Sequence, residues 1–113
     1  MGKSEKDKIV EKYIKEEGFI PVSWYGDEAV KNRQILIGTE EQKWKLEKSF
    51  KRFLNTEHKN PKWKVLERLT AGIVGSGLWL VEYKPTGMKM IIDATASGRS
   101  FTDNDYHIVA VRR

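Results

Sequence analysis

The sequence predicts an α+β fold in which two helices, near residues 5–17 and 40–56, pack on one face of an antiparallel sheet of about four to five strands. Two observations lead to this prediction. Apolar residues recur at helical spacing in the first half of the chain, whereas the second half alternates short apolar runs with turn residues. The connections in the second half are short, which favours hairpins and therefore antiparallel pairing. Residues 1–113 are predicted to form one domain, large enough to bury about 65% of its unfolded surface.

The helix near residues 5–17 is marked at both ends. Ser4 has the hydroxyl expected of an N-cap, and Gly18 suits the left-handed position that follows a helix. Between them runs a narrow apolar stripe, formed by Ile9, Val10, Tyr13 and Ile14. The rest of this helix mixes lysines with glutamates, which is typical of a solvated surface.

The helix near residues 40–56 carries stronger signals. Thr39 and Gln42 have the spacing of a capping box, in which each side chain accepts a hydrogen bond from the other residue's backbone amide. Its buried side is predicted to hold Leu46, Phe50, Phe53 and Leu54, which fall within one arc at helical spacing. Trp44 projects away from that arc, beside Lys48 and Lys51.

The segment between the two helices is less decisive. Phe19 to Trp24 fits a short strand, and Pro21 predicts an edge position because proline has no amide to donate. Residues 27–37 fit either a capped helix or a loop followed by a strand over residues 34–37. We favour the loop and strand, because Ile35 begins a short apolar run that ends at a glycine.

The second half of the chain is predicted to form most of the sheet. Leu78 to Lys84 and Met88 to Ala94 flank a turn that contains proline and glycine, and they are predicted to pair as a hairpin. A last strand is predicted over Tyr106 to Arg112. Residues 63–71 fit a strand or a short helix, because their apolar residues agree with both periods.

Composition excludes several kinds of site. The chain has no cysteine, which rules out disulfides, thiolate metal sites and cysteine nucleophiles. No apolar run approaches the roughly 20 residues of a membrane span, and the charged N-terminal residues lack the apolar region of a signal peptide, so we expect a cytoplasmic protein that does not enter membranes. Only His58 and His107 are available as imidazole ligands, and the acidic run at residues 103–105 lacks the later glycine and acid of a calcium loop. Neither a metal nor another cofactor is predicted.

Positive charge is concentrated in one segment. Residues 43–64 contain eight Lys or Arg residues against Glu47 and Glu57, a net charge of +6, whereas the whole chain carries +5. Cations bind phosphates and an exposed indole stacks on an unpaired base, so we predict a small basic binding module for RNA or DNA. The predicted contact residues are Trp44, Lys45, Lys48, Lys51, Arg52, Lys59, Lys62 and Lys64.

An acidic protein surface would select the same cations. The first alternative is therefore a protein-binding inhibitor or adaptor. Tryptophan is enriched at interface hot spots, and the candidate anchors are Trp24, Trp44, Trp63 and Trp79.

The second alternative is a small metal-independent endoribonuclease. Such an enzyme needs a general base, an acid and cations around the phosphorus. The first candidates are His107, Glu82 and Arg112, and Tyr106, Arg99 and Arg113 are further ones.

The second half of the chain also carries a resemblance. Gly77-Leu78-Trp79 at the start of a strand and Tyr106 to Arg113 at the chain end resemble the ending of toxin endoribonucleases from toxin–antitoxin modules, over about forty residues. The resemblance implies RNA as the substrate. The long N-terminal helix and the loop between Ala94 and Tyr106 depart from that pattern. With no complete catalytic motif, we favour a binding role over catalysis.

Overall fold

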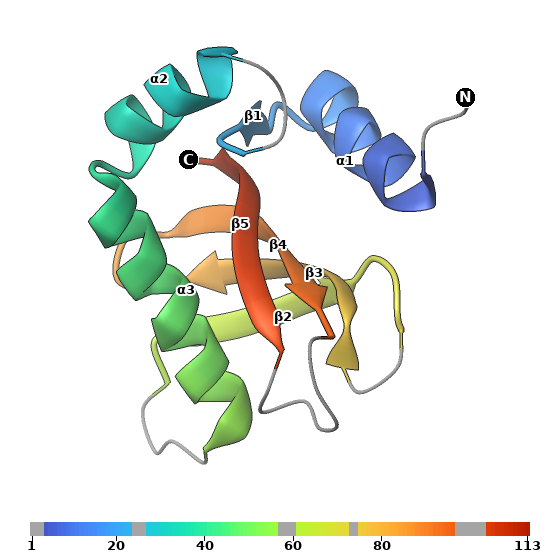
Figure 1. Ribbon diagram of the computed structural model, residues 1–113, viewed down its shortest axis with the longest axis vertical. Coiled ribbons are helices and arrows are strands. Elements are labelled where there is room, and N and C mark those ends of the chain that lie inside the picture. Colours follow the sequence, from blue (N-terminus) through green and yellow to red (C-terminus); the bar gives the residue numbers. More distant parts are fainter. Residues whose placement is uncertain (1–3, 24–26, 57–60, 73–74, 97–103) are drawn as a thin grey trace.

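The computed structural model describes residues 4–23, 27–56, 61–72, 75–96 and 104–113. Within these ranges the chain forms three helices and five strands (Figure 1). In chain order they are α1 (Glu5–Glu16), β1 (Ile20–Pro21), α2 (Asp27–Leu36), α3 (Glu40–Asn55), β2 (Trp63–Arg68), β3 (Gly77–Tyr83), β4 (Met88–Thr95) and β5 (Asp105–Arg112).

The five strands form one antiparallel sheet in the order β1-β5-β4-β3-β2. β3 and β4 pair from Gly77 opposite Ala94 to Tyr83 opposite Met88, which confirms the predicted hairpin. β1 lies at an edge, where Pro21 costs no hydrogen bond within the sheet. The α+β class and the antiparallel sheet are therefore confirmed, and residues 63–68 form a strand rather than a short helix.

The two predicted helices begin where their caps indicated. The Ser4 hydroxyl accepts a hydrogen bond from the Asp7 amide at 3.2 Å. At α3 the capping box is complete, because Gln42 N donates to Thr39 Oγ1 at 3.1 Å and Thr39 N donates to Gln42 Oε1 at 2.7 Å. None of the helices in the described ranges is long and apolar enough to cross a membrane.

The preference for a loop and a strand over residues 27–37 is wrong, because most of this segment is helix α2. The three residues of the apolar run that suggested a strand do not share one environment. Ile35 is 66% exposed on the helix, whereas Leu36 and Ile37 pack on the core. Tertiary contacts hold α2 in place. Ala29 is buried and the Asn32 side chain donates to the Pro21 carbonyl at 3.0 Å, neither of which a local sequence pattern reveals.

The prediction that the helices share one face of the sheet is also wrong, because α1 and α3 lie on opposite faces (Figure 1). Phe50 of α3 packs with Met90 and Ile92, whereas Val10 of α1 packs with Ile91 on the other face. The strands are apolar on both faces, and each face therefore requires a helix to cover it.

A β-bulge interrupts β5 next to α3. Ile91 lies opposite Ala110 and Ile92 lies opposite Ile108, so Val109 is an additional residue in β5. A bulge locally redirects the backbone groups of its strand. Here the Ile108 amide donates to a carboxylate oxygen of α3.

Candidate functional site

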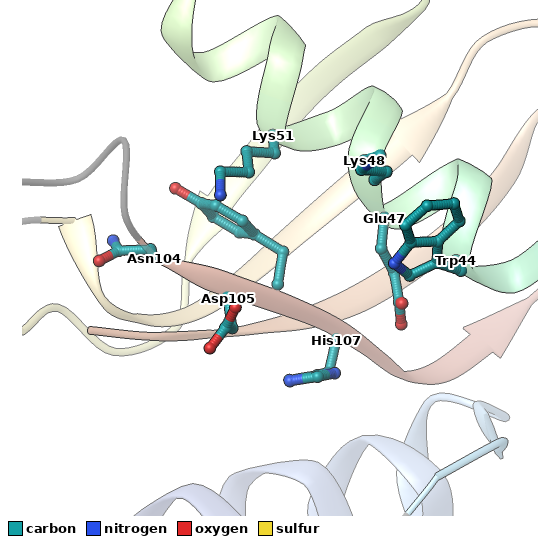
Figure 2. A pocket seen from close by; sticks show the side chains of 8 residues that line it. Trp44, Glu47, Lys48, Lys51, Asn104, Asp105 and His107 are labelled. Atoms are coloured by element: carbon teal, nitrogen blue, oxygen red, sulfur yellow. The ribbon is translucent and has the colours of Figure 1, made fainter. Parts of the chain in front are cut away.

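A groove of about 150 Å³ with a mixed polar and aromatic lining lies beside α3 and the start of β5 (Figure 2). Four of its lining residues come from α3, and the other four are consecutive: Asn104, which precedes β5, and the first three residues of β5. They are Trp44, Glu47, Lys48, Lys51, Asn104, Asp105, Tyr106 and His107. Figure 2 shows the α3 residues on one side of β5 and Asp105 and His107 on the other.

Trp44 is the exposed aromatic residue of this groove. Its side chain is 52% exposed, and Lys48 Nζ lies 4.0 Å from the centroid of the indole ring. A cation over an indole at an exposed site stabilises the pair by about 0.5–1 kcal/mol. Lys51 follows one helical turn later and lines the same groove. The α3 side therefore presents an aromatic surface and two cations together.

Glu47 lies in the same lining, but its charge is already neutralised. Its carboxylate accepts hydrogen bonds from Lys43 Nζ and, at 2.8 Å, from the Ile108 amide at the bulge. Only 11% of the Lys43 side chain and 9% of the Glu47 side chain are exposed. The hydrogen bond from the Ile108 amide to Glu47 joins α3 to β5, and the Lys43–Glu47 pair holds this carboxylate in position, so the two contacts fix the shape of the groove.

The β5 residues of the groove alternate between buried and exposed positions. Asn104 and Tyr106 are buried, whereas Asp105 and His107 are exposed. The Tyr106 ring packs edge-on against Phe50, with centroids 5.8 Å apart. Burial raises the pKa of Tyr106, and a hydrogen bond from Asn104 and the charge of Arg68 oppose that rise. Tyr106 is therefore a neutral phenol at physiological pH.

The structure divides the predicted basic face into separate parts. Trp44, Lys48 and Lys51 line the groove, but Lys45 lies elsewhere on α3 and is paired with Glu41 at 3.7 Å. Arg52 is exposed and falls beside Lys45 at helical spacing, about 80° around the helix from Trp44.

The cations that follow α3 do not join the groove either. Lys64 lies opposite Glu82, and its strand neighbours Trp63 and Val65 pack on the α3 side, so Lys64 points to the other face of the sheet. Lys62 is exposed just before β2, and Lys59 lies outside the described residues.

The three first candidates for ribonuclease catalysis do not meet. Glu82 and Arg112 both flank Lys89, whereas His107 lies opposite Asp93, four residues further along β4. At roughly 3.3 Å per residue, the position of His107 is therefore about 13 Å along the strands from that of Glu82 and Arg112. Arg112 Nη1 lies 3.9 Å from Glu17 Oε2, close to the end of α1. Of the further candidates, Arg99 lies outside the described residues.

Two of the four tryptophans proposed as interface anchors are structural. Trp63 is 2% exposed and donates through Nε1 to Ser49 Oγ at 2.9 Å. Trp79 donates to the Gly75 carbonyl and is covered by the Arg68 guanidinium, 3.8 Å from the ring centroid. Trp24 lies outside the described residues, so among those that the structure describes Trp44 is the exposed tryptophan.

Sequence reasoning missed the structural role of the Lys43–Glu47 pair and the position of Asp105. A count of charges places both residues of the pair in solvent, and the sequence pattern indicates Asp105 only as part of an incomplete calcium loop. A signal was present in the alternation of residues 104–108, which places Asp105 and His107 on one face of a strand. In the described ranges, no three His, Asp or Glu side chains gather where they could hold a metal ion.

Comparison of the chain with protein-family models, with curated proteins and with solved structures gives no match.

Proposed function

We propose that the groove between α3 and β5 binds a single strand of RNA or DNA. The observation that carries this proposal is the half-exposed Trp44, which lies next to Lys48 and shares the groove with Lys51. Base stacking on an aromatic side chain contributes about 1–3 kcal/mol per base, and nearby cations bind the phosphates that the strand brings with it. A role in binding, rather than catalysis, agrees with the wide separation of His107 from Glu82 and Arg112.

The Lys43–Glu47 pair supports the same proposal. A free carboxylate in this position would repel phosphates, but Glu47 is neutralised by Lys43 and by the Ile108 amide. Because α3 is fixed to β5 by these contacts, Trp44 and Lys48 are held in place before a ligand arrives. Such preorganisation lowers the entropy that binding must overcome.

The decisive test compares two charge reversals on the same helix. In the first variant, Lys48→Glu and Lys51→Glu remove the cations of the groove. In the matched control, Lys45→Glu and Arg52→Glu make the same change in net charge on another side of α3. Each is titrated with short single-stranded RNA and DNA, by fluorescence anisotropy, at about 50 and 200 mM salt.

The groove variant is expected to bind at least about tenfold more weakly than the control. Its salt dependence should also decrease, by about 1.4 in the slope of log K against log salt, because two phosphate contacts to a single strand are lost. Equal weakening in the two variants would mean that only net charge matters, and would refute a specific site. If the unmodified protein binds neither nucleic acid, an acidic protein surface becomes the better partner for these cations.

Folding must be monitored in the same experiment. Exposed substitutions generally change stability by less than about 0.5 kcal/mol each, and the contact between Lys48 and Trp44 adds about 0.5–1 kcal/mol to the first variant. A thermal unfolding curve for each variant shows whether a loss of binding has another cause. The Trp44→Phe variant then tests stacking, since it keeps both lysines.

A further inference from the structure

The size of the groove limits what it can hold. The groove beside β5 has a volume of about 150 Å³ and is partly open to solvent, so it can enclose part of a single base. If a strand of nucleic acid lies along α3, the groove therefore takes one base rather than several. This step, like those that follow, rests on the proposed function.

Charge fixes the orientation of that nucleotide. The α3 side carries Lys48 and Lys51, whereas the β5 side carries the exposed carboxylate of Asp105. A phosphate is attracted to the lysines and repelled by Asp105. The sugar–phosphate backbone must then lie toward α3, and the hydrogen-bonding edge of the base must lie toward β5.

Asp105 also determines which base fits. An ionised carboxylate has two acceptor oxygens and no donor. Guanine presents two adjacent donors on its Watson–Crick edge, N1–H and the N2 amino group. On the same edge of adenine, cytosine and uracil, every donor has an acceptor beside it, which would face a carboxylate oxygen. We propose that Asp105 makes the groove selective for guanine.

Four short oligonucleotides test this selectivity against the unmodified protein. They are UUGUU, UUAUU, UUCUU and UUUUU, which share a backbone and differ in one base. Binding is followed through quenching of tryptophan fluorescence. A good bidentate contact discriminates by about tenfold or more, so UUGUU is expected to bind at least about tenfold more tightly than the other three.

The Asp105→Asn variant assigns the preference to this side chain. An amide has one acceptor and one donor in place of two acceptors, so the preference for UUGUU should fall to within about twofold of UUUUU. Affinity for UUUUU should stay the same or rise, because a negative charge leaves the groove. Glu16→Gln, an equal change of charge at an exposed position on α1, is the matched control and should retain the preference.

The possible results separate this inference from the proposed function. Four equal affinities in the unmodified protein would refute the selectivity and leave nucleic-acid binding intact. A preference for guanine that persists in Asp105→Asn would place base recognition elsewhere. Absence of binding to all four oligonucleotides would overturn the proposed function itself, and the selectivity with it.

Discussion

Removing the Glu47 carboxylate should destabilise this protein more than any ordinary change on the surface of α3. In Glu47→Ala the Lys43 side chain, which is only 11% exposed, loses its charge partner. The Ile108 amide loses its hydrogen-bond acceptor as well. Breaking a buried pair from one side typically costs about 3–5 kcal/mol, because a charge is left buried without a partner. The remaining exposure of Lys43 lets water reach its ammonium group, so we expect the lower end, about 3 kcal/mol.

The matched control is the exposed pair on the same helix. Lys45 and Glu41 also stand four residues apart, but their side chains are 67% and 73% exposed. Surface pairs of this type contribute about 0.3–0.5 kcal/mol, and a first-turn acid adds a similar interaction with the helix dipole, so Glu41→Ala should cost less than about 1 kcal/mol. The assay is urea unfolding followed by circular dichroism and tryptophan fluorescence. In thermal unfolding of the same variants, a loss of about 3 kcal/mol in the free energy of unfolding should lower the melting temperature of a chain of this size by about 12 °C.

A double variant shows whether the cost comes from the unpaired charge. Lys43→Met combined with Glu47→Gln removes both charges and keeps an acceptor for the Ile108 amide, so it should recover most of the lost stability. The reasoning fails if Glu47→Ala costs no more than Glu41→Ala. It also fails if the double variant is less stable than Glu47→Ala.

Two further predictions concern the start of α3 and the ionisation of Tyr106. Thr39→Ala should lower the free energy of unfolding by about 1 kcal/mol and Thr39→Ser should not, because serine keeps the hydroxyl that accepts from the Gln42 amide; urea denaturation of both variants checks this. Burial raises the folded-state pKa of Tyr106 above its unfolded value near 10, so its contribution to stability is complete below about pH 10 and is lost as the pH rises through the folded-state pKa. Melting temperatures measured between about pH 9 and 11 should fall less steeply in Tyr106→Phe than in the unmodified protein. Equal slopes would contradict the assignment. Burial also raises the pKa of Tyr13, which therefore contributes to the slope in both proteins.

The parts of the fold that the sequence predicts are those with local signals. α3 is specified by Thr39, Gln42 and an apolar arc, all within one helix, and the exposure of Trp44 follows from the same spacing. The signals of α2 are weaker, because a possible cap competes with an apolar run typical of a strand, and the helix is held by a side-chain contact from Asn32 to the Pro21 carbonyl. The second helix-covered face was missed for a related reason, since apolar residues on both sides of a strand do not reveal which helix covers each side.

The candidate site divides in the same way. Helical spacing alone places Lys48 and Lys51 beside Trp44. The orientation of Lys64 depends on its pairing with Glu82 in another strand, which no local pattern specifies. A count of charges treats Lys43 and Glu47 as solvated and so does not predict their burial. They are buried because the Ile108 amide, 61 residues from Glu47 in sequence, donates a hydrogen bond to the Glu47 carboxylate.

The contact between Glu47 and the Ile108 amide also affects how easily the open side of β5 could pair with a strand of another chain. β1 is only two residues long and pairs with the end of β5, at Ala110 and Val111. In the described residues, therefore, no strand pairs with the first half of β5 on the side away from β4. Open strand edges of this kind recruit strands from other molecules and begin aggregation. A side chain from α3 already occupies the Ile108 donor, and an incoming strand would have to displace a buried ion pair to reach it. Glu47 thus occupies a donor that a second chain would need for strand pairing, and variants that lose it should aggregate on storage even where enough folded protein remains.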